Sequence, residues 1–115
     1  MKPPSDPQRA LMRQIVEHGG DLAPTLNAQF AGCRTASEEH CAECFSLEVD
    51  GNGPLLPADT ECPLSFDAKT SVGSGAGDAL QVLLWHENGR IDNVEISSVV
   101  HPHPAVGDIR ILAPH

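Results

Sequence analysis

The residues of this chain that could do chemistry are concentrated in one stretch, GCRTASEEHCAECFSLEVDG, residues 32–51. Within it, two residues separate Cys41 from Cys44, and His40 comes directly before the pair. This spacing is typical of metal-ligand pairs and of redox dithiols. The stretch therefore raises three alternatives: a zinc site, a redox dithiol, or thiols without a chemical role.

Each alternative makes a structural demand. A structural zinc needs four ligands, usually in two short-spaced pairs, and only Cys41 and Cys44 form such a pair. A reactive dithiol is favoured at a helix N-terminus, whereas the alternating residues after Cys44 predict a strand. We therefore favour plain thiols. A zinc ion, the only cofactor that the sequence suggests, would be held in the Cys33–Cys62 region by Cys41, Cys44, Cys62 and His40.

Two helices are predicted near the N-terminus. Residues 6–18 place apolar side chains on one face, with Ser5 or Asp6 as the cap and Pro7 in the first turn. Residues 24–31 form a shorter second helix that Gly32 would end.

Strands are predicted in the rest of the chain. Residues 43–50 alternate, with Phe45 and Leu47 toward the core and Cys44 on the polar side. Residues 109–113 form a last strand. Residues 51–78 are rich in Gly, Pro, Ser and Asp, which indicates a long surface connection with at most a short strand at 64–66.

The clearest structural signal lies in residues 79–100. Asn88-Gly89 stands between two apolar runs, as in a two-residue hairpin turn with positive φ. With a regular two-residue turn, core residues of the first strand would stand opposite polar residues of the second strand. We therefore predict one extra residue in the second strand near Asp92-Asn93, which brings core residues opposite each other. The core face of this hairpin then contains Leu80, Val82, Leu84, Ile91, Val94 and Ile96.

These elements predict a single α+β domain over residues 1–115, with an N-terminal helix packed on a mainly antiparallel sheet of about four strands. Aromatic residues make up only 3% of the chain, so the core must be mostly aliphatic.

The charge of the chain restricts its partners. The formal net charge is −9, and residues 35–67 hold eight acids and no Lys or Arg. Such a field repels nucleic acid and anionic membranes. It either serves only as a solubilising face or attracts a basic protein surface. No apolar run is long enough to span a membrane, and the N-terminus has no secretory signal. We therefore expect a cytoplasmic protein with neither a nucleic-acid nor a membrane partner.

One face of the hairpin combines an aromatic residue with acids. Trp85 and Glu95 are predicted on the side opposite the core. Either a second layer covers that face, or the Trp is exposed near acidic side chains as in a protein-binding hot spot. No nucleophile, base or acid pair with catalytic spacing is present, so we expect no catalytic residue. The predicted partner-binding residues are Glu38, Glu39, Glu43, Glu48, Trp85 and Glu95.

The segments LQVLLWHENGRIDNVEISSVV and HCAECFSLEV resemble a set of small bacterial proteins, common in actinobacteria, that carry a Gly-Arg hairpin and a preceding cysteine-bearing strand. Small acidic α+β proteins of this kind occur as immunity proteins, which neutralise toxins by binding them. The resemblance implies a non-enzymatic, immunity- or antitoxin-like protein that binds a basic protein partner. No catalytic residue carries over from it, and it implies no particular oligomeric state.

Overall fold

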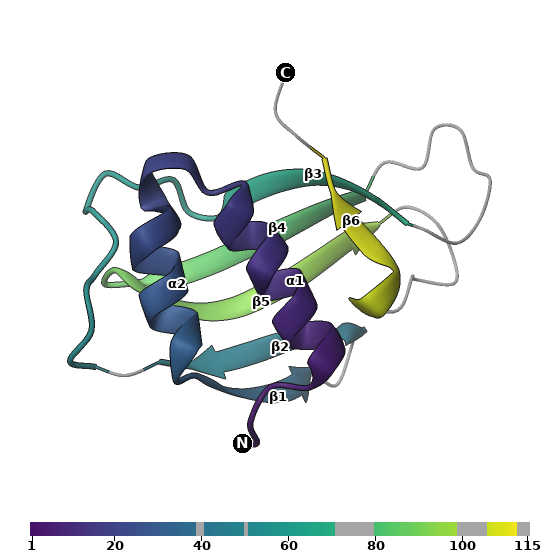
Figure 1. Cartoon of the computed structure of the whole chain (residues 1–115), viewed down its shortest axis with the longest axis horizontal. Coiled ribbons are helices and arrows are strands. Elements are labelled where there is room, and N and C mark those ends of the chain that lie inside the picture. Colours follow the sequence, from purple (N-terminus) through teal and green to yellow (C-terminus); the bar gives the residue numbers. More distant parts are fainter. Residues whose placement is uncertain (39–40, 50, 71–79, 99–105, 113–115) are drawn as a thin grey trace.

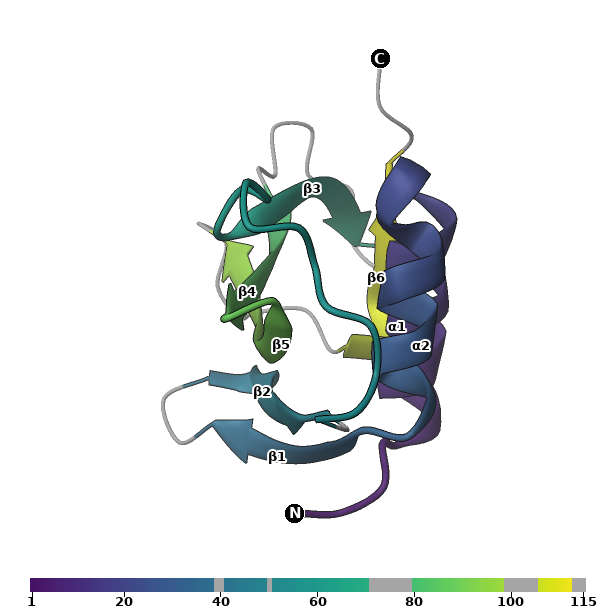
Figure 2. The ribbon, with the colours of Figure 1, turned by 90° about the vertical axis from the view of Figure 1, so that its left-hand side faces the viewer.

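Two helices cover one face of a curled antiparallel sheet (Figures 1 and 2). This computed structural model describes residues 1–38, 41–49, 51–70, 80–98 and 106–112; for residues 38, 41–43, 70 and 98 it describes the backbone alone. The expected α+β architecture with an N-terminal helix is confirmed.

The first helix, α1 (Asp6–Glu17), begins and ends close to its predicted bounds. Ser5 is the N-cap and forms a capping box with Gln8: the Gln8 amide donates to Ser5 Oγ at 3.2 Å, and the Ser5 amide donates to Gln8 Oε1 at 2.9 Å. These bonds satisfy backbone donors that the first helical turn leaves open. The apolar side of α1 is buried at Leu11, Met12 and Ile15.

The second helix, α2 (Ala23–Ala31), follows a single 3-10 turn, η1 (Gly20–Leu22). It buries Leu26 and Phe30, which are four residues apart and therefore share one face. Its third buried residue is polar, Gln29, and is only 4% exposed.

The sheet has six strands instead of the predicted four, in the order β1-β2-β5-β4-β3-β6, and every pairing is antiparallel. Their bounds are β1 Arg34–Glu38, β2 Cys41–Glu48, β3 Leu64–Thr70, β4 Leu80–Glu87, β5 Arg90–Ser98 and β6 Ile109–Ile111. A second 3-10 turn, η2 (Val106–Asp108), leads into β6.

Two strands, β1 and β3, have a weak alternation of apolar and polar residues. The sequence did not predict β1 and predicted only part of β3. In β1 the side chain of Thr35 is buried while Arg34 and Ser37 are exposed, so no apolar alternation marks this strand. In β3 the inward side chains of Leu64 and Phe66 are only half-buried. The expected short strand at 64–66 is therefore a seven-residue strand that pairs with β4 and β6.

The β4–β5 hairpin has the predicted turn and register. Asn88 and Gly89 have φ values of 54° and 80°, Leu84 is opposite Val94, and the register shifts between Trp85 and His86, which leaves Asp92 as the extra residue. Gly89 is also constrained by packing, because a Cβ there would lie 2.9 Å from Leu55 Cβ.

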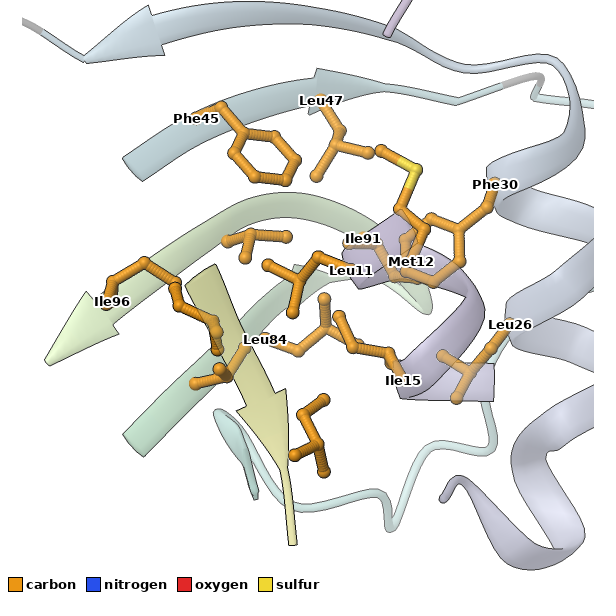
Figure 3. Packing of buried hydrophobic residues seen from close by; sticks show 14 of the residues in the cluster. Leu11, Met12, Ile15, Leu26, Phe30, Phe45, Leu47, Leu84, Ile91 and Ile96 are labelled. Atoms are coloured by element: carbon orange, nitrogen blue, oxygen red, sulfur yellow. The ribbon is translucent and has the colours of Figure 1, made fainter. Parts of the chain in front are cut away.

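The core lies between the helices and the inner face of the sheet (Figure 3). The six residues predicted for the core face of the hairpin are all buried, at 0–4% exposure. Figure 3 shows the side chains of Leu11, Met12 and Ile15 of α1 pointing toward those of Leu84 and Ile91 of the sheet.

The connection 51–63 packs against the turn of the hairpin. Gln29 Nε2 donates to the carbonyl oxygens of Pro54 and Gly89, at 2.9 and 2.8 Å, and its Oε1 accepts from the Ile91 amide at 2.9 Å. The Leu56 amide donates to the same Gly89 oxygen at 2.9 Å. One buried glutamine therefore joins α2, the connection and the hairpin.

Both outer strands of the sheet have partners along their free edges. Gln14 of α1 acts as a partner for β6: its Nε2 donates to Ile109 O at 2.9 Å, and its Oε1 accepts from the Ile111 amide at 2.8 Å. At the other edge, Lys2 exchanges two backbone hydrogen bonds with Thr35, at 3.0 and 2.8 Å. Such contacts block edge-to-edge association of sheets at these positions.

Candidate functional site

The outer face of the sheet carries two of the predicted partner-binding side chains, Trp85 of β4 and Glu95 of β5. The Trp85 indole is 37% exposed, and its Nε1 donates to Glu95 Oε1 at 3.0 Å. In the strand register Glu95 is opposite Leu83, so the hydrogen bond runs diagonally across the hairpin. The indole is thus held in one orientation while much of its surface stays in contact with solvent.

Both helices lie on the other side of the sheet (Figure 2). Among the described elements, no helix or strand covers the outer face of β4 and β5. The cross-strand neighbours of Trp85 there are Asn93 and, one strand farther, Ser46 of β2. We call Leu83, Trp85, Asn93, Glu95 and Ser46 the Trp85 surface.

Charges around the Trp85 surface are mixed. Asp67 of β3 is exposed and accepts a hydrogen bond of 3.4 Å from Gln81 Nε2. Glu48 is exposed on β2, where it is opposite Arg34 of the outer strand β1. Lys69 stands at the other end of the sheet, opposite Arg110 of β6. Glu95 therefore lies on a central strand, β5, whereas Asp67 and Lys69 share β3, and Arg34 and Arg110 lie on the outer strands β1 and β6.

The structure brings together only part of the predicted partner-binding set. Trp85 and Glu95 are in contact, and Glu48 lies on β2, which is two strands away from Trp85. Glu39 lies outside the described residues, and the side chains of Glu38 and Glu43 are not among those described.

The cysteines occupy separate environments. Cys33 is a free, buried thiol between α2 and β1. Burial raises the pKa of the Cys33 thiol, and the nearby Arg9 guanidinium lowers it by less. Cys62 is a free thiol exposed on the 51–63 connection, where it donates to His86 O at 3.2 Å.

Cys44 differs from two expectations. It is buried, at 3% exposure, instead of lying on the polar side of β2. The β1–β2 register shifts between Ser37 and Glu38, so the alternation of β2 is broken just before Phe45 and both Cys44 and Phe45 are buried. Its sulfur is part of a disulfide, not a free thiol, and accepts a hydrogen bond of 3.4 Å from the Ile96 amide.

This arrangement offers little to a zinc ion. Within the described part of the chain, no three His, Cys, Asp or Glu side chains are grouped as metal ligands. His40 lies outside that part, and the side chain of Cys41 is not described. A disulfide sulfur does not bind zinc as a thiolate does, so Cys44 in this form does not serve as a ligand.

A surface pocket of about 580 Å³ beside Cys62 includes a histidine that the sequence did not single out. His86 Nε2 lies 2.6 Å from Glu61 O, and because a carbonyl only accepts, Nε2 must carry the proton. The Cys62 thiol donates to the backbone oxygen of His86. Both groups are thus donors to carbonyls, which is not the arrangement of a nucleophile with its base.

Sequence reasoning also missed three glutamines that position these elements, Gln8, Gln14 and Gln29. Each of these glutamines is a long polar side chain next to the apolar stripe of a helix, which is the only local sign of its role. The backbone groups that they bind lie up to 97 residues away in the chain.

Comparisons with known proteins identify no relative. No family model matches the chain, and neither a curated protein nor a solved structure matches it. None of the helices in the described residues is long and apolar enough to cross a membrane.

Proposed function

We propose that this chain is a non-enzymatic binding protein, of the immunity or antitoxin kind, that uses the Trp85 surface to hold a basic protein partner. The observation that carries the proposal is the Trp85 indole, which is exposed on an open sheet face and oriented by Glu95. Large aromatic side chains with restricted motion are the commonest anchors of protein interfaces.

The sheet edges support the choice of this face. Gln14 and Lys2 occupy hydrogen-bonding positions on β6 and β1, so at those positions a partner has no free backbone groups to pair with. The inner face is filled by the core. The outer face of β4 and β5 is the part of the sheet that a partner reaches without displacing anything described.

The acids supply the second component of recognition. Glu95 touches the indole, and the acidic segment 35–67 contributes Asp67 to the same strand layer. Acidic groups around an apolar anchor favour a partner whose own surface is basic, and they act mainly on the association rate. Glu38, Glu39 and Glu43 are proposed to extend this field.

The alternative proposal, a zinc-binding protein of the Cys33–Cys62 region, has weaker support. Cys33 is buried beside α2, Cys44 is in a disulfide, and Cys62 is tied to the hairpin end of β4. These three sulfurs would have to leave separate environments to share an ion.

A first test needs no partner, because Trp85 is the only tryptophan in the chain. Relative to a free tryptophan analogue at equal ionic strength, a Trp in a negative field should be quenched more by caesium and less by iodide. Glu95→Gln should bring both relative quenching constants closer to those of the free analogue, and the matched control Glu17→Gln on α1 should not. A caesium-to-iodide ratio no higher than that of the free analogue would remove the acidic component of the proposal.

A second test addresses binding. Immobilised wild-type protein, Trp85→Ala and Glu17→Gln are compared as baits in an extract of the native host. The proposal requires a basic protein that is retained by the wild type and by Glu17→Gln and lost with Trp85→Ala. Retention that does not depend on Trp85 would contradict it.

A further inference from the structure

A second candidate site lies in the helical layer, away from the Trp85 surface. Helices α1 and α2 pack side by side, and a hollow of about 160 Å³ opens to solvent between them. It is lined by Arg9, Met12, Arg13, Val16, Asn27, Phe30 and Ala31. Its volume is close to that of a cavity that holds one benzene ring, about 150 Å³.

The floor of the hollow is apolar. Met12 and Phe30 are 4% and 8% exposed, and both line the hollow. Val16, which is half-buried, also lines it. A thioether and an aromatic ring form a favourable floor for a second ring.

The rim of the hollow is cationic. Arg9 and Arg13 are four residues apart and therefore lie one turn apart on the same side of α1. Arg9 Nε donates to Pro4 O at 3.1 Å, which restrains this side chain. None of the described residues that line the hollow is acidic, so nothing among them neutralises the two guanidinium groups.

The two layers of the molecule also differ in charge. Residues 1–33, which contain both helices, carry three cations, Lys2, Arg9 and Arg13, against three acids, Asp6, Glu17 and Asp21, which is a net charge of zero. The net charge of −9 therefore belongs to residues 34–115, which contain the sheet. A small anion is therefore repelled by most of the chain and finds its most favourable potential near α1.

We propose that this hollow binds a small carboxylic acid with a compact apolar body of about one aromatic ring. The ring lies on Met12 and Phe30, and the carboxylate pairs with the Arg13 guanidinium and with the nitrogens of Arg9 that Pro4 leaves open. Guanidinium–carboxylate pairs of this kind are short, directional and charge-assisted. The proposal is independent of the binding function assigned to the Trp85 surface.

The chain offers a site-resolved probe, because it has two methionines, Met1 and Met12. With ¹³C-methyl methionine, Met12 reports on the hollow, and Met1 lies outside it and serves as an internal control. Phenylacetate should shift the Met12 methyl resonance in a saturable way and leave Met1 in place. Phenylacetamide, which has the same shape without the charge, should bind at least about tenfold more weakly, since it forfeits the charge-assisted pair.

Variants separate a local site from a general effect of charge. Arg13→Gln should weaken phenylacetate binding about tenfold, whereas Arg110→Gln, an equal loss of charge on β6, should leave it within twofold. Arg13 is exposed, so the variant should keep its Met12 chemical shift and melting temperature without ligand. No saturable Met12 shift, equal affinity for the amide, or equal losses in the two variants would each overturn the proposal.

Discussion

The two faces of the β4–β5 hairpin differ in what determines their residues. On the inner face, Val82, Leu84 and Val94 have 0% exposure and are packed against the helices. On the outer face, Leu83 and Glu95 are half-buried and Trp85 is exposed. The inner face is required for folding, and its apolar residues therefore recur at every second position of the strand. The outer face contributes less to the core, so folding alone does not explain a large aromatic residue there.

The adjacent leucines of β4 test this contrast most strongly. Leu84→Ala should lower the free energy of unfolding by about 2–5 kcal/mol, because it leaves a cavity in the core. Leu83→Ala should cost less than about 1.5 kcal/mol, since this side chain is half-exposed and water can fill its place. Urea unfolding of both variants measures the difference, and equal losses would mean that the two faces are buried alike.

The hairpin turn should show the next largest effect. Gly89→Val should cost about 2–4 kcal/mol, because a β-branched residue is strained at φ 80° and its Cβ would meet Leu55 and the Leu56 backbone. Gly32→Ala is the control, since a Cβ there meets nothing within 4 Å. A loss near zero at position 89 in thermal unfolding would contradict both the turn and the docking of the connection.

Sequence reasoning succeeded where the signal is local and failed where it is not. The N-cap of the first helix, which is Ser5 of the two candidates, the Asn88-Gly89 turn and the hairpin register with its extra residue all follow from neighbouring side chains, and the structure confirms them. Strand β1 was missed because it is an outer strand with one buried side chain that the structure describes, Thr35. Cys44 was placed on the wrong face because a register shift interrupts β2.

For the candidate sites, too, the contacts between neighbouring strands could be predicted from the sequence and the contacts between distant segments could not. The placement of Trp85 beside Glu95 on the outer face follows from the hairpin register. The bonds of Gln29 to Pro54 and Gly89, and the hollow beside Arg13, join segments that are distant in the chain. No local pattern contains that information, because the contacts depend on how the helices are packed on the sheet.

Gln29 should have an intermediate effect on stability. Gln29→Ala removes three hydrogen bonds and leaves the buried Ile91 amide without its side-chain acceptor, although Gly89 O keeps its bond from the Leu56 amide, and the loss should cost about 1–3 kcal/mol. The change should also detach the 51–57 segment from the hairpin turn. Hydrogen exchange at the Leu56 amide should become faster than in the wild type by more than the global loss of stability explains.

The two free thiols should differ in reactivity and in their effect on pH dependence. A thiol reagent should modify exposed Cys62 quickly and buried Cys33 only on unfolding. Because burial raises the Cys33 pKa in the folded state, its contribution to stability is full below the ordinary thiol value of about 8.5 and is lost as pH rises from that value through the raised pKa of the folded state. Cys33→Ala should reduce this alkaline slope, and an unchanged slope would contradict the assignment.

Trp85→Ala should be the mildest of these changes in the fold and the most damaging in binding. The indole contributes only to the outer face, so the free energy of unfolding should change by less than about 1.5 kcal/mol.

The Glu38→Gln, Glu39→Gln, Glu43→Gln triple variant should likewise leave stability nearly intact. It should flatten the salt dependence of association, because exposed charges are screened over about 8 Å at physiological ionic strength.

The most direct test of the binding account is the dissociation rate of the basic partner from wild-type protein and from Trp85→Ala, measured at low and at high salt. The dissociation rate should be at least about tenfold higher for Trp85→Ala at both salt concentrations, because loss of an anchor that the partner buries acts mainly on dissociation. Dissociation rates that agree within twofold, with the variant fully folded, would show that the Trp85 surface is not where the partner binds.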